Sequence, residues 1–192
     1  MSVDCVSRPP DFGNDLCTYG KIGERFFLGV HGRQMYDNGY DVYDVSSIPF
    51  WQHIDIDFVV AKKGSKLKND WECVYNEEFT KIEVKVDTRA HETGNLPYEV
   101  ISHGNFGWSI NTYADKVFFI VCKDGITDGK LYAYTEYLID MKKWKEYASY
   151  GNNSFRRPNC IRNEEIYDFL HKIEDLKEAK VIIAEQTINT WI

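Results

Sequence analysis

The sequence lacks the features that mark several classes of protein. Its five cysteines are widely spaced and include no CxxC pair, so neither a zinc site nor a disulfide framework is predicted. It contains no run of 18 apolar residues, and residues 1–12 carry no apolar core of signal-peptide length. Internal repeats and low-complexity stretches are also absent from the sequence. We therefore expect a reduced, cytoplasmic protein without a membrane segment.

Positive charge is in short supply, since the formal net charge is -7. This balance argues against a protein that coats nucleic acid through bulk charge. It does not exclude a nucleic-acid enzyme, because active-site carboxylates add to the negative total while basic loops act locally. A hydrophobic content of 43% over 192 residues predicts one folded domain with a sizeable core.

Hydrophobic periodicity predicts an α/β sandwich around a mixed sheet flanked by helices. Apolar residues at helical spacing predict a first helix over 18–35. The continuous apolar run at 116–122 is typical of a strand buried on both faces. The other expected strands are at 40–45, 50–61, 71–75, 79–87, 108–110, 131–138 and 181–184. Three more helices are expected: a short one that ends near residue 102, and two that cover 141–150 and 164–176. Residues 1–15 and 154–162 are expected to be irregular.

The most informative stretch is Lys81-Ile82-Glu83-Val84-Lys85-Val86-Asp87. Its strict alternation predicts a strand with one dry face and one charged face. A second alternating stretch, Ile54 to Val60, places Asp55 and Asp57 on one face of a second strand. Carboxylates on neighbouring strands can hold Mg²⁺, and the packed charges would repel one another without a cation.

A lysine two residues from a ligand carboxylate points at the same spot. Lys85 stands in this relation to Glu83, so it can position or activate a water or stabilise charge on a phosphate. Asp87 shares that face, either as a partner of Lys85 or as a strand-end cap. The pattern therefore predicts a metal site suited to phosphodiester cleavage.

These residues resemble the PD-(D/E)XK nuclease superfamily. The stretch Glu83 to Thr88 followed by Thr93-Gly94-Asn95 is similar to a phage-type branch with Glu-x-Lys-x-Asp and then Thr-Gly-Asn. Tyr113 to Lys116, before an apolar strand, is similar to that branch as well. The resemblance covers about residues 18–148 and implies a restriction-endonuclease-like core, with residues 151–192 as a helix and strand extension.

The resemblance implies a role for each candidate residue. Asp57 and Glu83 would bind Mg²⁺, for which Mn²⁺ would substitute, and Glu24 would complete the site from the first helix unless it is a surface carboxylate. Asp55 competes with Asp57 for the metal role, although Asp57 leads directly into the apolar run. Glu99, on a helix after the Thr-Gly-Asn turn, would occupy another polar position of the family. Ile56 departs from the family, which has proline before the aspartate.

The implied activity is endonucleolytic cleavage of DNA by an enzyme of phage or mobile-element origin. The substrate form stays open between branched DNA and duplex ends, and a homodimer stays open too. Residues proposed to contact nucleic acid are Lys62, Lys63, Lys66, Lys68 and Asn95. The four lysines fall within seven residues and are alternatively a soluble hairpin loop.

Two other readings of the sequence remain. The chain could be a nuclease-like fold with a disused site, which binds nucleic acid or inhibits a host protein. It could also be a structural α/β protein whose charged strand lies at an edge. The complete set of Asp, Glu and Lys favours the enzyme, since a disused site has no physical reason to keep like charges together.

Overall fold

The computed structural model describes residues 12–102, 104–127, 130–150, 156–161 and 164–191. The strands are β1 (Tyr40–Asp44), β2 (Phe58–Lys62), β3 (Thr80–Asp87), β4 (Asn95–Ser102), β5 (Asn105–Phe106), β6 (Lys116–Thr127), β7 (Lys130–Asp140), β8 (Arg156–Ile161), β9 (Glu164–Lys172) and β10 (Ile182–Trp191). The helices are α1 (Phe12–Phe27), α2 (Arg33–Asp37), α3 (Pro49–Gln52), α4 (Trp71–Tyr75), α5 (Ala90–Thr93), α6 (Trp108–Asn111), α7 (Met141–Ser149) and α8 (Ile173–Glu178).

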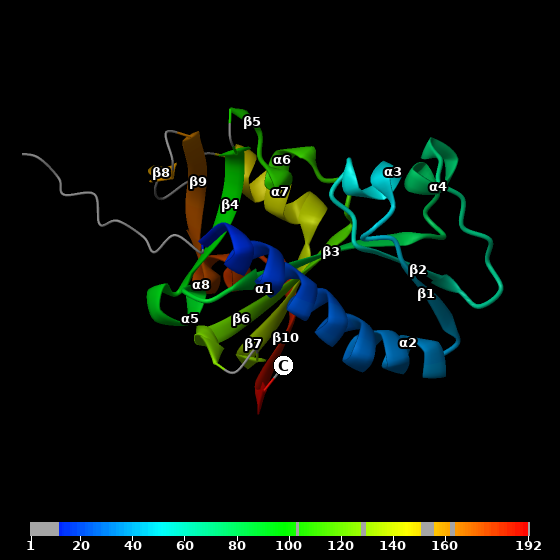
Figure 1. Cartoon of the computed structure of the whole chain (residues 1–192). Coiled ribbons are helices and arrows are strands. Elements are labelled where there is room, and N and C mark those ends of the chain that lie inside the picture. The colour runs from blue at the N-terminus through cyan, green and yellow to red at the C-terminus, as the bar shows by residue number, and fades with distance from the viewer. Residues whose placement is uncertain (1–11, 103, 128–129, 151–155, 162–163, 192) are drawn as a thin grey trace, which may run out of the picture.

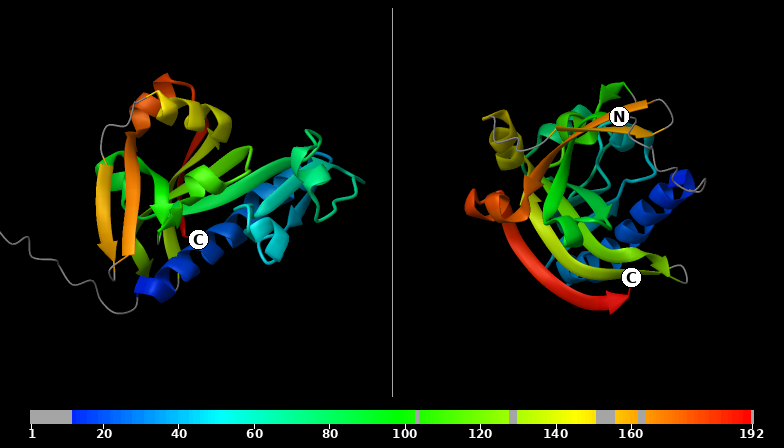
Figure 2. Two further views of the ribbon diagram at one scale, coloured as in Figure 1. Left: turned by 90° about the horizontal axis from the view of Figure 1, so that it is seen from above. Right: turned by 90° about the vertical axis from the view of Figure 1, so that its left-hand side faces the viewer.

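Two sheets organise the chain. The larger has the order β1-β2-β3-β6-β7-β10, and the smaller has the order β5-β4-β9-β8 (Figure 1). In the larger sheet β3 and β6 are parallel, whereas the other neighbouring strands are antiparallel. The last strand, β10, curves along the outer edge of this sheet (Figure 2). The expected mixed sheet flanked by helices is confirmed.

One face of the larger sheet is covered by α1. Ile82 and Val84 from β3 pack there with Phe26 and Phe27 of the helix. A methyl group added at Gly23 would lie 2.4 Å from a methyl carbon of Val86, so this glycine lets the helix lie close against the strand. The dry face expected for this strand is thus the face that packs against α1.

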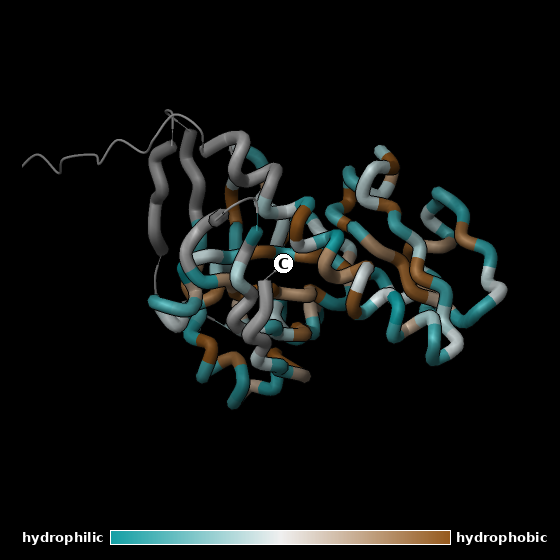
Figure 3. The backbone as a smooth tube through the Cα atoms, turned by 60° about the horizontal axis from the view of Figure 1, so that its bottom comes forward, coloured by the Kyte–Doolittle hydropathy of each residue, from teal (hydrophilic) through white to brown (hydrophobic). Residues whose placement is uncertain are grey.

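The opposite face carries two apolar clusters. The first, the interior cluster, includes Val117 and Phe119 and packs against β4, α7 and α8. The second, the hairpin cluster, includes Val59 and Ala61 and packs against α3 and α4. The charged residues of β3 lie between the two clusters, because Lys81 is opposite Val59 and Glu83 is opposite Val117. Hydrophobic stretches follow these strands in Figure 3, whereas the loop after β2 is mostly hydrophilic.

A π-helical turn over Leu28–Gly32 joins α1 to α2. It places the His31 ring beside Phe27 and Phe118, with centroid distances of 5.8 and 4.4 Å. Nε2 of His31 lies 2.9 Å from Oε2 of Glu136, a buried residue of β7. The expected helix over 18–35 is confirmed, although it starts at Phe12, inside the stretch expected to be irregular.

Several expected strands are helical. Residues 50–57 do not extend β2, because Pro49 occupies the first turn of α3. Residues 71–75 form α4 rather than a strand, since Oδ1 of Asp70 accepts a hydrogen bond from the Cys73 amide at 3.0 Å and caps the helix. Residues 108–110 are likewise part of α6.

Other expected helices are strands. The segment expected to be a helix ending near 102 is β4, and most of the helix expected over 164–176 is β9; these two strands pair with each other. Part of the stretch expected to be irregular after residue 154 is β8, which pairs with β9. The sequence also predicted that Asn163 caps the helix expected over 164–176 and that Gly151 ends the helix expected over 141–150. Both residues lie outside the described residues. In the described part of the chain, no helix has the length and apolar character needed to cross a membrane.

Candidate active site

Glu83 and Lys85 form the centre of the candidate site. Period-2 alternation along β3 turns both side chains to the face between the interior and hairpin clusters. Glu83 is only 4% exposed, and its Oε1 forms a close ion pair with Nζ of Lys85. The sheet therefore holds a charged pair where an apolar contact would be expected.

Asp57 reaches this pair from the neighbouring chain segment. It precedes β2, and its amide donates to the Ile82 carbonyl at 3.0 Å. Its Oδ2 accepts a hydrogen bond from the Val84 amide at 2.8 Å, between Glu83 and Lys85 in sequence. The expectation that Asp57 lies within a strand is wrong, but the β2–β3 pairing still carries its carboxyl to the site.

Burial, together with the nearby charge of Glu83, raises the pKa of Asp57 to about 8. Burial also raises the pKa of Glu83, although the Lys85 ammonium and a side-chain hydrogen bond with Asp57 oppose that rise. Oε2 of Glu83 is buried and accepts no hydrogen bond from an amide, amine or hydroxyl among the described residues. The two carboxyl groups therefore need a shared proton or a bound cation between them.

Lys85 is held as a cation. Burial lowers the pKa of its amine, but the pairing with Glu83 outweighs this and raises it to about 12. Nζ lies 4.9 Å from the centre of the Trp108 ring, on whose face a cation is attracted. Trp108 is itself anchored, since its amide donates to Oε1 of Glu99 at 3.2 Å. The lysine side chain is 28% exposed, so a ligand can reach it.

Two further carboxylates surround this centre. The charge of Glu24, on α1, raises the pKa of Asp57 after the larger effects of burial and Glu83. Asp55 acts on the pKa of Glu83 in the same direction. The expectation that Asp55 and Asp57 share one strand face is wrong, because Asp55 lies in a turn with a positive φ of 50°. Its Oδ2 accepts a hydrogen bond from Nδ2 of Asn111 at 3.0 Å.

The two outer charges of the strand have local structural partners. Lys81 pairs with Asp115 at 2.9 Å and also donates to the Phe79 carbonyl. Oδ1 of Asp87 accepts hydrogen bonds from the amides of Arg89 and Ala90 at 2.6 and 2.7 Å. Of the two roles open to Asp87, the structure shows the strand-end cap.

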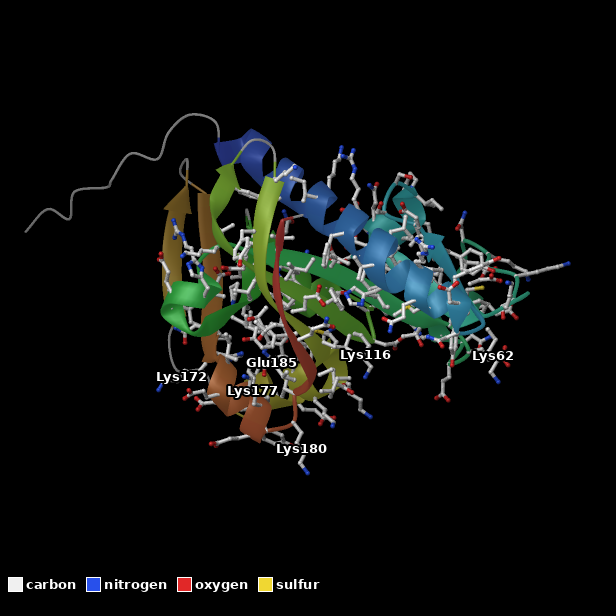
Figure 4. The ribbon with its side chains drawn as sticks, turned by 90° about the horizontal axis from the view of Figure 1, so that it is seen from below. Lys62, Lys116, Lys172, Lys177, Lys180 and Glu185 are labelled. Atoms are coloured by element: carbon white, nitrogen blue, oxygen red, sulfur yellow. The ribbon has the colours of Figure 1, made fainter. Side chains whose placement is uncertain are left out.

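The residues proposed to contact nucleic acid lie at opposite ends of the molecule. Lys62 ends β2, roughly 16 Å along that strand from Asp57 at the usual rise per residue. Asn95 starts β4 opposite Lys172, and Figure 4 shows Lys62 and Lys172 far apart. The Asn95 side chain donates to the Thr93 carbonyl at 2.7 Å, which is a local turn contact. Lys63, Lys66 and Lys68 are exposed in the loop after β2.

Sequence reasoning missed the residues of α6 that border the site. Trp108 faces Lys85, Asn111 binds Asp55, and the Thr112 hydroxyl donates to the Asp55 carbonyl at 2.8 Å. No local pattern marked them, since each contact spans more than 20 residues of sequence. Glu99 was placed on a helix, but it lies on β4 and positions Trp108.

The residues at the centre can supply few metal ligands. In the described ranges no group of three or more His, Cys, Asp or Glu side chains has an arrangement that could hold a metal ion. Mg²⁺ is commonly bound through only one or two carboxylates, with waters and substrate phosphates completing its shell. Asp57 and Glu83 fit that pattern, because Oε2 of Glu83 is buried without a hydrogen-bond partner among the described residues and the Asp57 carboxyl interacts with the same group.

The chain matches no known protein family, no curated protein and no solved structure in comparisons with each.

Proposed function

We propose that the chain is a Mg²⁺-dependent nuclease that hydrolyses phosphodiester bonds in DNA, with a restriction-endonuclease-like core of the PD-(D/E)XK superfamily. The observation that carries the proposal is the buried Glu83, which pairs with Lys85 through Oε1, leaves Oε2 without a hydrogen-bond partner among the described residues and interacts with the Asp57 carboxyl. Such an arrangement costs folding free energy through desolvation, so a purely structural role would favour apolar residues at these positions.

The residues divide the chemistry as follows. Hydrolysis forms a bond between a water oxygen and phosphorus, breaks one phosphorus–oxygen bond and delivers a proton to the leaving oxygen. A Mg²⁺ ion held by Asp57 and Glu83 would supply positive charge for the phosphate and acidify a bound water. Lys85, fixed by Glu83 and the Trp108 ring, donates hydrogen bonds to the phosphate or orients the water.

The competing function is a nuclease-like fold that binds a host protein or nucleic acid without cleavage. It is supported by the lack of a three-residue metal group in the described part of the chain and by the ion pair that already occupies Lys85.

On the nuclease proposal, the protein acts in the cytoplasm of a bacterial host, as the resemblance to a phage-type branch suggests.

The direct test is cleavage of duplex, single-stranded and branched DNA, and of RNA, with Mg²⁺, with Mn²⁺ and with a chelator. We expect metal-dependent cleavage of at least one DNA form. No cleavage of any substrate by folded protein would contradict the proposal and favour the binding function.

Metal binding can be tested separately by thermal unfolding with Mn²⁺. A ligand at 100 times its dissociation constant stabilises the folded state by about 2.7 kcal/mol, so the midpoint should rise by several degrees. Asp57→Asn should remove this rise. The matched control is Asp115→Asn, which changes a carboxylate on the same side of the sheet that pairs with Lys81, and it should keep the rise. An equal shift in both variants would exclude Asp57 as a ligand.

A further inference from the structure

Four aromatic side chains gather beside the site, and we call them the aromatic patch: Phe50, Trp71, Tyr75 and Tyr113. Trp71 lies at its centre, with ring centroids 5.6 Å from Phe50, 5.8 Å from Tyr75 and 5.3 Å from Tyr113. Aromatic rings usually bury their surface, yet Trp71 is 44% exposed, Tyr75 68% and Tyr113 42%. The exposed rings thus form one continuous surface rather than isolated residues.

The patch is held in place by backbone and side-chain contacts. Asp70 caps the short helix that carries Trp71 and Tyr75. The Tyr113 amide donates to the Ile54 carbonyl at 3.1 Å, and the rings of Tyr75 and Tyr113 contact each other with centroids 6.2 Å apart. Because few rotamers remain free, a ligand that covers these rings loses little side-chain entropy on binding.

The patch continues into a cleft of about 750 Å³. Tyr113 belongs to both, and the exposed Phe106 and Ile110 also line the cleft. Three lysines (Lys116, Lys142 and Lys145) and three carboxylates (Asp115, Asp140 and Glu146) line the same cleft, and Lys116 pairs with Asp140 at 2.7 Å. On the other side of the patch, the loop that enters α4 carries the exposed Lys66 and Lys68. Lysines therefore lie on both sides of the aromatic surface, among carboxylates that include Glu72, which lies 3.8 Å from Lys68.

The patch also leads to the candidate active site. The Tyr113 amide binds the carbonyl of the residue directly before Asp55, and Asn111 and Thr112 bind Asp55 itself. The charge of Asp55 in turn acts on Glu83 and Lys85. Residues 111–113 and Asp55 thus connect the aromatic patch to the charged centre.

We propose that the aromatic patch binds the unpaired bases of single-stranded DNA, whose backbone continues past Asp55 to the Glu83–Lys85 pair. Every base offers a π-face, and rings interleaved with lysines bind single strands through stacking and phosphate contacts. Base-paired DNA keeps its bases stacked on one another and cannot use these rings. The inference rests on the proposed nuclease function for its substrate class, and it selects single strands, flaps and overhangs over intact duplex.

The test is binding of a fluorescein-labelled oligo(dT) 20-mer to the full chain, measured by anisotropy with a chelator present so that no cleavage occurs. We expect Trp71→Ala and Tyr75→Ala each to weaken binding roughly 5- to 150-fold, the range for loss of one stacked base. Trp71→Phe, which keeps a ring, should retain most of the affinity. The matched control is Tyr150→Ala, which removes an 81% exposed ring that follows α7 and lies outside the patch.

If both alanine variants bind oligo(dT) as tightly as the wild type does, the inference is overturned. So would the absence of oligo(dT) binding, or a patch variant that changes only the oligomeric state, which would assign the rings to a second copy of the chain. Failure of the nuclease proposal alone would look different from failure of this inference. In that case no substrate would be cleaved, yet oligo(dT) binding would still be weakened by Tyr75→Ala. Tyr75 is mostly exposed, so its loss should not unfold the protein.

Discussion

Two lysines four residues apart on the same face of β3, Lys81 and Lys85, each pair with a carboxylate, and the two pairs differ in how completely their hydrogen-bonding capacity is satisfied. Lys81 pairs with Asp115 at 2.9 Å. The Lys81 amide also donates to the Asp115 carboxylate, and the Asp115 amide donates to the Lys81 carbonyl. Glu83 pairs with Lys85 through Oε1, but its buried Oε2 has no hydrogen-bond partner among the described residues.

This difference separates a charged pair that stabilises the fold from one that is available for chemistry. The Lys81–Asp115 pair ties the start of β3 to the segment that enters β6, and Asp115 remains 43% exposed, so the pair needs nothing further. At the second pair, an incompletely satisfied buried carboxylate raises the free energy of the folded protein unless a proton or cation joins it. Burial of charge is common to both pairs, whereas unmet bonding capacity marks only the Glu83–Lys85 pair.

The largest effect should come from Lys85→Met. This change removes the cation closest to the proposed phosphate position, and loss of one such donor typically lowers the rate about 10²–10³-fold. Initial rates of Mg²⁺-dependent DNA cleavage, with the unfolding midpoint as a check on folding, measure the effect. A cleavage rate within tenfold of wild type would show that Lys85 takes no part in the chemistry. The Glu83–Lys85 pair would then have a structural role, like the Lys81–Asp115 pair.

Lys81→Met should have the opposite profile, with lower stability and unchanged chemistry. The substitution breaks the ion pair and the hydrogen bond to the Phe79 carbonyl, at a cost of about 1–3 kcal/mol once the exposure of Asp115 is allowed for. Urea unfolding measures this cost. Cleavage per folded molecule should stay near wild type, and a selective loss of activity would show that the whole charged face takes part.

A third effect should appear in the pH dependence of stability. The pKa of Asp57 is raised from 3.8 to about 8, so between these values the folded protein holds a proton that the unfolded chain has released. The contribution of Asp57 to stability therefore falls as pH rises through that window. Urea midpoints at pH 5 to 8 without metal should decline, and Asp57→Asn should flatten the decline. An unchanged profile in Asp57→Asn would place the raised pKa elsewhere.

Strand alternation predicted the centre of the site because it depends only on neighbouring residues. Period 2 along β3 puts Glu83 and Lys85 on one face wherever that strand lies. Asp57 was also predicted to join them, and it does so through the antiparallel pairing of β2 with β3. The uninterrupted apolar run of β6 likewise predicted a strand buried on both faces, against which β3 pairs in parallel.

The surroundings of the site depend on contacts that local patterns do not encode. The aromatic and β-branched residues of 71–75 favoured a strand, but the cap by Asp70 and packing in the hairpin cluster make it a helix. Residues 164–172 have apolar positions at helical spacing, yet pairing with β4 makes them a strand. Capping residues such as Asp70 and Pro49 were usable signals in the sequence, whereas the β4–β9 pairing was not.

The π-helical turn at Leu28–Gly32 takes up one residue more than an α-helical turn would. Its hydrogen bonds span five residues instead of four, so a chain one residue shorter here could form a regular helix while the residues beyond the turn kept nearly the same facing. His31 lies within the turn, and its contact with Glu136 depends on this local widening. The extra residue thus acts as an insertion confined to the turn. A deletion within it should disturb the His31–Glu136 contact while α2 still packs against β1, and a substitution at the exposed Val30 should disturb neither.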